Sequence, residues 1–161
     1  MERDNPRPGE EPFAANPAEL APEAGLVFIG RIVSPWLDRS DCPKNLREAR
    51  ERGRSALIEL DPLYWPATHG LEPGMRVHLL YWMNEARRDL AIQAPRHRPD
   101  PVGTFALRSP VRPNPIALAN VSLIRIAADT NTLEIDAIDC ISGTPLLDIK
   151  PFLPSVDVPS E

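Results

Sequence analysis

The alternation of apolar and polar positions in this chain predicts short β-strands joined by turns. Several segments rich in β-branched and apolar residues are bounded by Gly, Pro, Asn, Asp or Ser, as is typical of strands. We expect strands at residues 26–33, 55–60, 75–83, 102–107, 119–126, 133–139 and 146–150. The pair 119–126 and 133–139 alternates strongly, with Asn131 and Thr132 between them, and therefore predicts a hairpin.

One short helix interrupts this pattern, at residues 45–52. Glu48 lies four residues before Arg52, and Gly53 follows as a C-cap. Residues 84–100 are polar and Arg-rich and predict a long connection. The fold class that follows is all-β with one short helix, arranged as a small closed or nearly closed β-barrel.

Composition divides the chain into a tail and one domain. Residues 1–24 are rich in Pro, Glu and Ala and bury too little apolar surface to order themselves, so we expect a mobile tail. Residues 25–161 then form a single barrel domain, and the 20 prolines in 161 residues argue against a helical bundle. No apolar run is long enough to span a bilayer and the N-terminus is too charged for a signal peptide, so we expect a cytoplasmic protein.

Metal binding and indiscriminate nucleic-acid binding are both disfavoured. Cys42 and Cys140 are the only cysteines and the three histidines are scattered, so we expect no metal. The net charge is -5, yet residues 87–112 contain six Arg and two Asp. This segment predicts a local surface for phosphate groups inside an acidic protein.

Residues 103–118, GTFALRSPVRPNPIAL, form the stiffest and most donor-rich stretch of the chain. Prolines 110, 113 and 115 restrict both their own backbone and that of the preceding residues, whose carbonyls have few local donors. Arg108 and Arg112 each carry a planar fork of donors that suits a carboxylate or a phosphate. Two interpretations stay open: a rigid structural turn, or a preorganised site for an anionic ligand.

A second dense stretch, residues 139–151, reads DCISGTPLLDIKP. Gly143 permits a positive φ in the Ser-Gly-Thr-Pro turn, which brings backbone N–H groups toward a ligand. Asp139 and Asp148 flank the turn, and Lys150 lies on the same strand face as Asp148. A structural ion pair and a catalytic pair are both compatible with this spacing. No Rossmann turn, P-loop or nucleophile-elbow signature is present.

Together, FALRSPVRPNPIAL and GTPLLDIKPFLP resemble the signatures of the TrmO/TsaA-like family, with similarity over residues 27–158. The resemblance implies a small β-barrel methyltransferase that uses S-adenosylmethionine, forms a homodimer and holds the cofactor near the subunit interface. It further implies tRNA as the substrate, methylated at N6 of the threonylcarbamoyl-adenosine beside the anticodon.

The resemblance also assigns site residues by position. The cofactor-binding set that it implies is Pro43, Lys44, Asn45, Met83, Asn84, Arg108, Ile138, Ile141, Ser142, Gly143 and Thr144. The catalytic set is Asp139, Asp148 and Lys150, with a carboxylate as a general base. The substrate-binding set is Arg112 and Asn114, where Arg112 orders its own loop, reaches the partner subunit or meets an RNA phosphate.

Several positions depart from the family pattern. A usual Pro-Arg-Gln segment is Pro-Lys-Asn at residues 43–45, a His-Gln pair is Met83-Asn84, and a usual Asp is Ser142. The family Tyr is Phe152, and Leu107 replaces a Thr. We also expect the chain to lack the C-terminal domain of longer bacterial members. Two alternatives to a tRNA enzyme therefore remain: a methyltransferase for a small molecule or another RNA, and a cofactor-binding module without catalysis.

Overall fold

The computed structural model describes residues 5–160, and they group into two compact units. The barrel unit comprises Leu26–Trp82 and the residues from Leu118 onward. The insert unit comprises the residues up to Gly25 together with Met83–Ala117.

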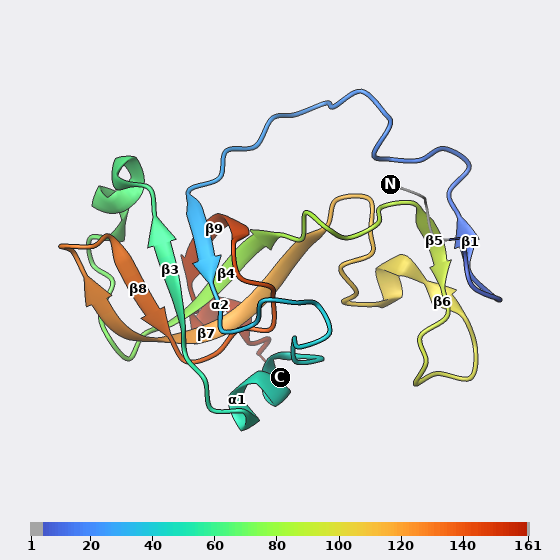
Figure 1. The fold of residues 1–161 in the computed structure, drawn as a ribbon. Coiled ribbons are helices and arrows are strands. Elements are labelled where there is room, and N and C mark those ends of the chain that lie inside the picture. The colour runs from blue at the N-terminus through green and yellow to red at the C-terminus, as the bar shows by residue number, and fades with distance from the viewer. Residues whose placement is uncertain (1–4, 161) are drawn as a thin grey trace. The chain divides into compact units, whose positions relative to one another are not determined.

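Six strands close the barrel unit in the order β2-β3-β8-β7-β4-β9 (Figure 1). The strands are β2 (Gly30–Val33), β3 (Ala56–Leu60), β4 (Arg76–Trp82), β7 (Ile116–Ala127), β8 (Thr132–Ile135) and β9 (Thr144–Pro151). The predicted all-β class and closed barrel are confirmed. Closure follows from the pairing of β2 with both β3 and β9, which are far apart in the sequence.

Alternate residues of these strands fill the barrel. Ile32, Ile58, Leu79, Val121 and Leu133 all have 0% exposure, and their sequence neighbours face outward or are only partly covered. This alternation is the one expected for a small barrel whose interior is packed with side chains.

The predicted helix is α1 (Leu46–Glu51), one residue shorter at each end than expected, because Asn45 and Arg52 are its cap residues. Asn45 caps it by accepting a hydrogen bond from the Glu48 N–H at 2.9 Å. Glu48 pairs with Arg52, the C-cap, and Gly53 directly after it has a φ of 62°, the left-handed conformation that ends many helices. Two more short helices, η1 (Pro62–Thr68) and α2 (Pro154–Asp157), follow β3 and β9.

Two predicted strands of the barrel unit are shorter than expected. The segment predicted as a buried strand from residue 26 starts only at Gly30, and Leu26, Val27 and Phe28 are 58%, 65% and 48% exposed. These residues have the composition of a strand but no partner strand. The hairpin is confirmed, with Asn131 at a φ of 53°, although β8 ends at Ile135 and leaves residues 136–143 as a connection.

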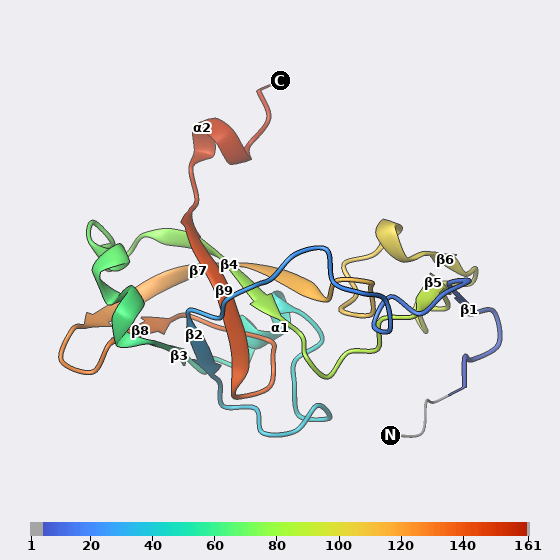
Figure 2. The ribbon, with the colours of Figure 1, turned by 90° about the horizontal axis from the view of Figure 1, so that it is seen from above.

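The insert unit contains a small sheet in the order β1-β5-β6 (Figure 2). Its strands are β1 (Glu11–Pro12), β5 (Leu90–Gln93) and β6 (Val102–Gly103), followed by the helix η2 (Thr104–Ala106). The expected connection at 84–100 thus contains a strand, and the strand expected at 102–107 is two residues long, because η2 begins at Thr104. The predicted tail at 1–24 and domain at 25–161 stay predictions; residues 1–4 lie outside the described residues.

Candidate functional site

The connection from β8 to β9 forms a tightly held turn around Gly143. Gly143 has a φ of 89°, as the sequence predicts. No heavy atom lies within 4 Å of the position that a Cβ would occupy there, so the turn presents an open backbone surface. Thr144 Oγ1 donates to the Ile141 carbonyl at 2.6 Å and closes the turn.

The backbone donors of this turn are directed into the protein, contrary to the expectation that they approach a ligand. The N–H groups of Ser142, Gly143 and Thr144 donate to the carbonyls of Trp36, Ile32 and Ile141. The Ile138 carbonyl accepts from the Trp36 indole N–H at 2.8 Å, and the Cys140 carbonyl accepts from Ser34 Oγ at 2.7 Å. These bonds make the turn rigid. Ile138 is itself 1% exposed and belongs to the core.

Asp139 is held by a residue that sequence reasoning did not single out. The Tyr81 hydroxyl donates to Asp139 Oδ1 at 3.0 Å, and Tyr81 is 3% exposed. Tyr81 lies on the inward face of β4, where the alternation predicts a core residue. Its polar end needs a partner because a buried hydroxyl without one is costly. That requirement is the sequence signal from which a polar partner for Tyr81 could have been predicted.

Asp148 and Lys150 form the ion pair that the sequence predicts, at 3.1 Å. Their side chains are 45% and 62% exposed, so the pair contributes little to stability. A β-bulge shifts the register between β4 and β9 at Leu80/Tyr81. The extra residue turns Asp148 and Lys150 to the outer face, whereas Leu146 before it is buried. Asp148 is therefore oriented differently from Asp139.

The loop before α1 carries three residues of the predicted cofactor set. Pro43 is buried, whereas Lys44 and Asn45 are exposed, and Asn45 is already used as the helix cap. Cys42 lies beside them, and its pKa is raised by burial and by the nearby Asp139 carboxylate. This loop and the 138–144 turn are thus neighbours within the barrel unit.

The proline-rich loop in the insert unit is held by arginine side chains. Arg112 Nη1 donates to the carbonyls of Leu107 and Ser109 at 3.2 and 3.0 Å. Arg88 donates to the Pro113 carbonyl and reaches Asn114 Oδ1 at 3.5 Å. Of the carbonyls expected to have few local donors, those of Ser109 and Asn114 do accept hydrogen bonds, the second from the Ile116 N–H at 2.7 Å. Of the roles considered for Arg112, ordering its own loop is the one that these contacts support.

The remaining predicted residues also lie in the insert unit. Arg108 and Asn84 are exposed, and Met83 is partly buried with its N–H bonded to the Pro115 carbonyl at 2.8 Å. The cofactor-binding, catalytic and substrate-binding roles assigned to these positions stay predictions.

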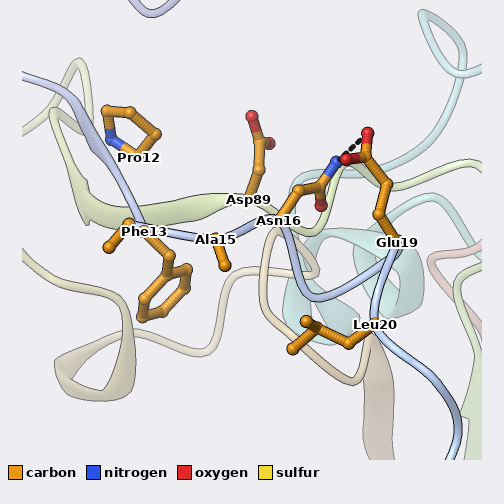
Figure 3. Close-up of a pocket in the computed structure, with 8 residues that line it drawn as sticks. Pro12, Phe13, Ala15, Asn16, Glu19, Leu20 and Asp89 are labelled. Atoms are coloured by element: carbon orange, nitrogen blue, oxygen red, sulfur yellow. Dashed lines mark hydrogen bonds between the residues drawn. The ribbon is translucent and has the colours of Figure 1, made fainter.

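One pocket of about 500 Å³ lies in the insert unit (Figure 3). Its lining residues are Pro12, Phe13, Ala14, Ala15, Asn16, Glu19, Leu20 and Asp89. None of them belongs to the predicted site. Asn16 Nδ2 bonds Glu19 Oε1 at 3.2 Å across the pocket wall, and the Asp89 carboxylate pairs with Arg87. We assign neither cofactor binding nor catalysis to this pocket.

Within residues 5–160, no group of three or more His, Cys, Asp or Glu is placed to hold a metal ion. In the same range, no helix has the length and apolar character needed to cross a bilayer.

The barrel unit belongs to the class of small closed six-stranded β-barrels, and comparison with known proteins identifies the family. The model of the tRNA-methyltransferase O N-terminal domain matches residues 31–158. The chain therefore belongs to the TrmO N-terminal domain family, and the predicted resemblance is confirmed.

Two named proteins and one solved structure are similar to this chain. A probable S-adenosyl-L-methionine-binding protein VirR of Rhizobium radiobacter is 40% identical over 129 residues, covering 80% of this chain and 71% of that protein. A tRNA (adenine(37)-N6)-methyltransferase of Eikenella corrodens is 47% identical over 57 residues, which cover 35% of this chain and 32% of that protein. A crystal structure of TrmO superposes with a TM-score of 0.68 at 29% identity, covering 87% of this chain and 62% of that one.

The name of the Rhizobium radiobacter protein agrees with the predicted cofactor, S-adenosylmethionine. The chain spans about three fifths of the length of the solved TrmO structure that it matches.

Proposed function

We propose that this chain is an S-adenosylmethionine-dependent methyltransferase that methylates N6 of threonylcarbamoyl-adenosine beside the anticodon of tRNA. The observation that carries the proposal is family membership over residues 31–158, together with a rigid turn at Gly143 that follows the hydrogen-bonded pair Tyr81–Asp139. The homodimer and the tRNA substrate belong to the same proposal.

The residues of the barrel unit fit the proposed cofactor. S-adenosylmethionine carries a positive sulfonium and an ammonium group, which a nearby carboxylate stabilises. Asp139 supplies such a carboxylate in a half-buried position. The open backbone surface at Gly143 leaves room for close approach of a ligand, because any Cβ there would stand in that space. A turn whose donors are already bonded loses little entropy when a ligand binds.

When bound, the cofactor supplies an activated methyl group on a positively charged sulfur. Charge is neutralised rather than created during transfer, so the chain needs no oxyanion hole and acts mainly by positioning and water exclusion. The substituted N6–H is weakly basic and somewhat acidic, which suits removal of its proton by a carboxylate. We assign that base to Asp139, because the Tyr81 hydroxyl fixes its orientation from inside the barrel. Asp148, on the outer face and paired with Lys150, serves as the comparison.

The proposal is tested in two measurements on the full chain. Isothermal titration calorimetry with S-adenosylmethionine tests cofactor binding. Transfer of tritiated methyl groups to total tRNA from a strain lacking its own enzyme tests the acceptor, with tRNA carrying unmodified adenosine at the same position as the control. We expect binding and transfer only to the threonylcarbamoyl-modified tRNA.

Other results identify the alternatives. Transfer to a metabolite pool or to another RNA, with none to this tRNA, indicates a different acceptor. Binding without transfer to any pool indicates a non-catalytic module. Absence of cofactor binding by folded protein refutes all three. Within the enzyme, Asp139→Asn must lose turnover while Asp148→Asn retains it; equal retention by both removes the carboxylate base.

A further inference from the structure

Trp36 connects the 138–144 turn to a group of arginines on the barrel unit. Its indole N–H and its carbonyl bond to Ile138 and Ser142, both at 2.8 Å. The guanidinium carbons of Arg52 and Arg54 lie 5.1 and 5.5 Å from the centroid of the same ring. Because the ring is 5% exposed and fixed by these bonds, it holds two positive charges beside the candidate site.

A third arginine belongs to the same surface. Arg39 lies in a turn that two backbone hydrogen bonds close. The Asp41 N–H donates to the Asp38 carbonyl, and the Cys42 N–H donates to the Arg39 carbonyl. Arg52 Nη1 donates to the Asp41 carbonyl at 2.6 Å and so ties this turn to the end of α1. Arg39 and Arg52 both act to lower the pKa of the Cys42 thiol, against the larger effect of burial, as expected for two guanidinium groups near one sulfur.

The charge of this region differs from that of its unit. Residues 39–54 contain six Lys or Arg and three Asp or Glu. The barrel unit as a whole contains ten Lys or Arg and fourteen Asp or Glu. Arg52 is paired with Glu48 at 2.5 Å, and Arg47 approaches Glu51 at 3.6 Å. Within residues 5–160, neither Arg39 nor Arg54 has a carboxylate partner. Both are exposed, so their charge is available to an external anion.

We infer that Arg39, Arg52 and Arg54, here named the Trp36 arginine cluster, bind phosphodiester groups of the RNA substrate; this inference rests on the proposed function. Guanidinium forks match phosphate oxygens, and contacts to phosphates position a nucleic acid without reading its sequence. Stacking on a fixed ring pre-orders Arg52 and Arg54, which lowers the entropy lost on binding. The cluster is separate from the arginines of residues 87–112, and it holds the RNA backbone next to the turn that carries Asp139.

The test compares two double variants with the same change in charge. Arg39→Ala with Arg54→Ala removes the two members of the cluster that have no carboxylate partner among residues 5–160, and neither belongs to the candidate site. Arg31→Ala with Arg125→Ala is the control, since both side chains are more than 60% exposed and paired with carboxylates on neighbouring strands. Binding of full-length tRNA is measured by fluorescence anisotropy over a series of salt concentrations, and steady-state methyl transfer is measured in parallel.

The cluster variant is expected to lower the slope of log affinity against log salt by about one to two, because each phosphate contact contributes roughly 0.7 to 0.9. Its KM for tRNA rises, while kcat and cofactor affinity are unchanged. Arg39→Lys with Arg54→Lys retains most of the slope, since a phosphate accepts either cation. The control keeps the wild-type slope.

Equal slopes for the cluster variant and the control overturn the inference. Wild-type protein that binds tRNA but transfers no methyl group to it refutes the proposed function, while the difference in slope still decides the cluster. Wild-type protein that binds no tRNA overturns both.

Discussion

Substitution of Gly30 by alanine tests whether the closure of the barrel depends on close contact between β2 and β3. A Cβ at this position would lie 2.2 Å from the Glu59 carbonyl oxygen and 2.9 Å from the Leu60 Cα. Ordinary contact begins at 3.4 Å, so one strand must move by roughly 1 Å. Both contacts are backbone atoms, which no side-chain rotation relieves. We expect the free energy of unfolding to fall by about 3 kcal/mol, the upper part of the range for overpacking.

The measurement is urea unfolding followed by far-UV circular dichroism, where a loss of this size lowers the midpoint by about 1–2 M. Gly25→Ala and Gly103→Ala are the controls, because no atom lies within 4 Å of either added Cβ and neither residue has a positive φ. Both should change stability by less than about 1 kcal/mol. Cofactor affinity should fall with Gly30→Ala, since β2 also supplies the Ile32 carbonyl that accepts the Gly143 N–H. A midpoint equal to that of the controls would refute the predicted strain.

Two further outcomes follow from buried polar groups. Tyr81→Phe should lower kcat about tenfold with little change in KM, because it removes one hydrogen bond to the Asp139 carboxylate, worth about 1.5 kcal/mol. Steady-state methyl transfer measures this change, and an unchanged kcat contradicts the prediction. Burial raises the pKa of the Cys140 thiol from 9.0 to about 12, so the unfolded chain releases this proton first and stability is lost from about pH 9 upward. Relative to Cys140→Ala, the wild type should lose about 1.4 kcal/mol by pH 10 in urea unfolding, and parallel pH profiles would exclude the effect.

The barrel strands were predictable where turn residues bound them. The segment from Ser55 to Leu60 and the segment from Met75 to Met83 differ from β3 and β4 by at most one residue at each end. The helix and the glycine that ends it, Gly53, were predictable for the same reason, since capping depends on residues within one turn.

The elements that the sequence did not reveal depend on distant partners. β5 is four residues long and pairs with β1 and β6 from separate parts of the chain, so no local pattern distinguishes it from the Arg-rich connection around it. Tyr81 and Asp139 are separated by 58 positions, and alternation alone identifies Tyr81 as core. The contacts of Arg112 are local, within five residues, yet its sequence allowed an external ligand equally well.

The bulge between β4 and β9 also constrains which changes of length the GTPLLDIKP segment tolerates. Deleting the extra residue, Leu147, would restore regular pairing and leave Asp148 opposite Leu80 and Ile149 opposite Leu79, as they are now. Deleting Ile149 instead, with the bulge kept, would move Lys150 into the inward position opposite Leu79. Within this segment, loss of a residue is therefore tolerated best at the bulge itself, and the length of the strand beyond the bulge is under stronger constraint.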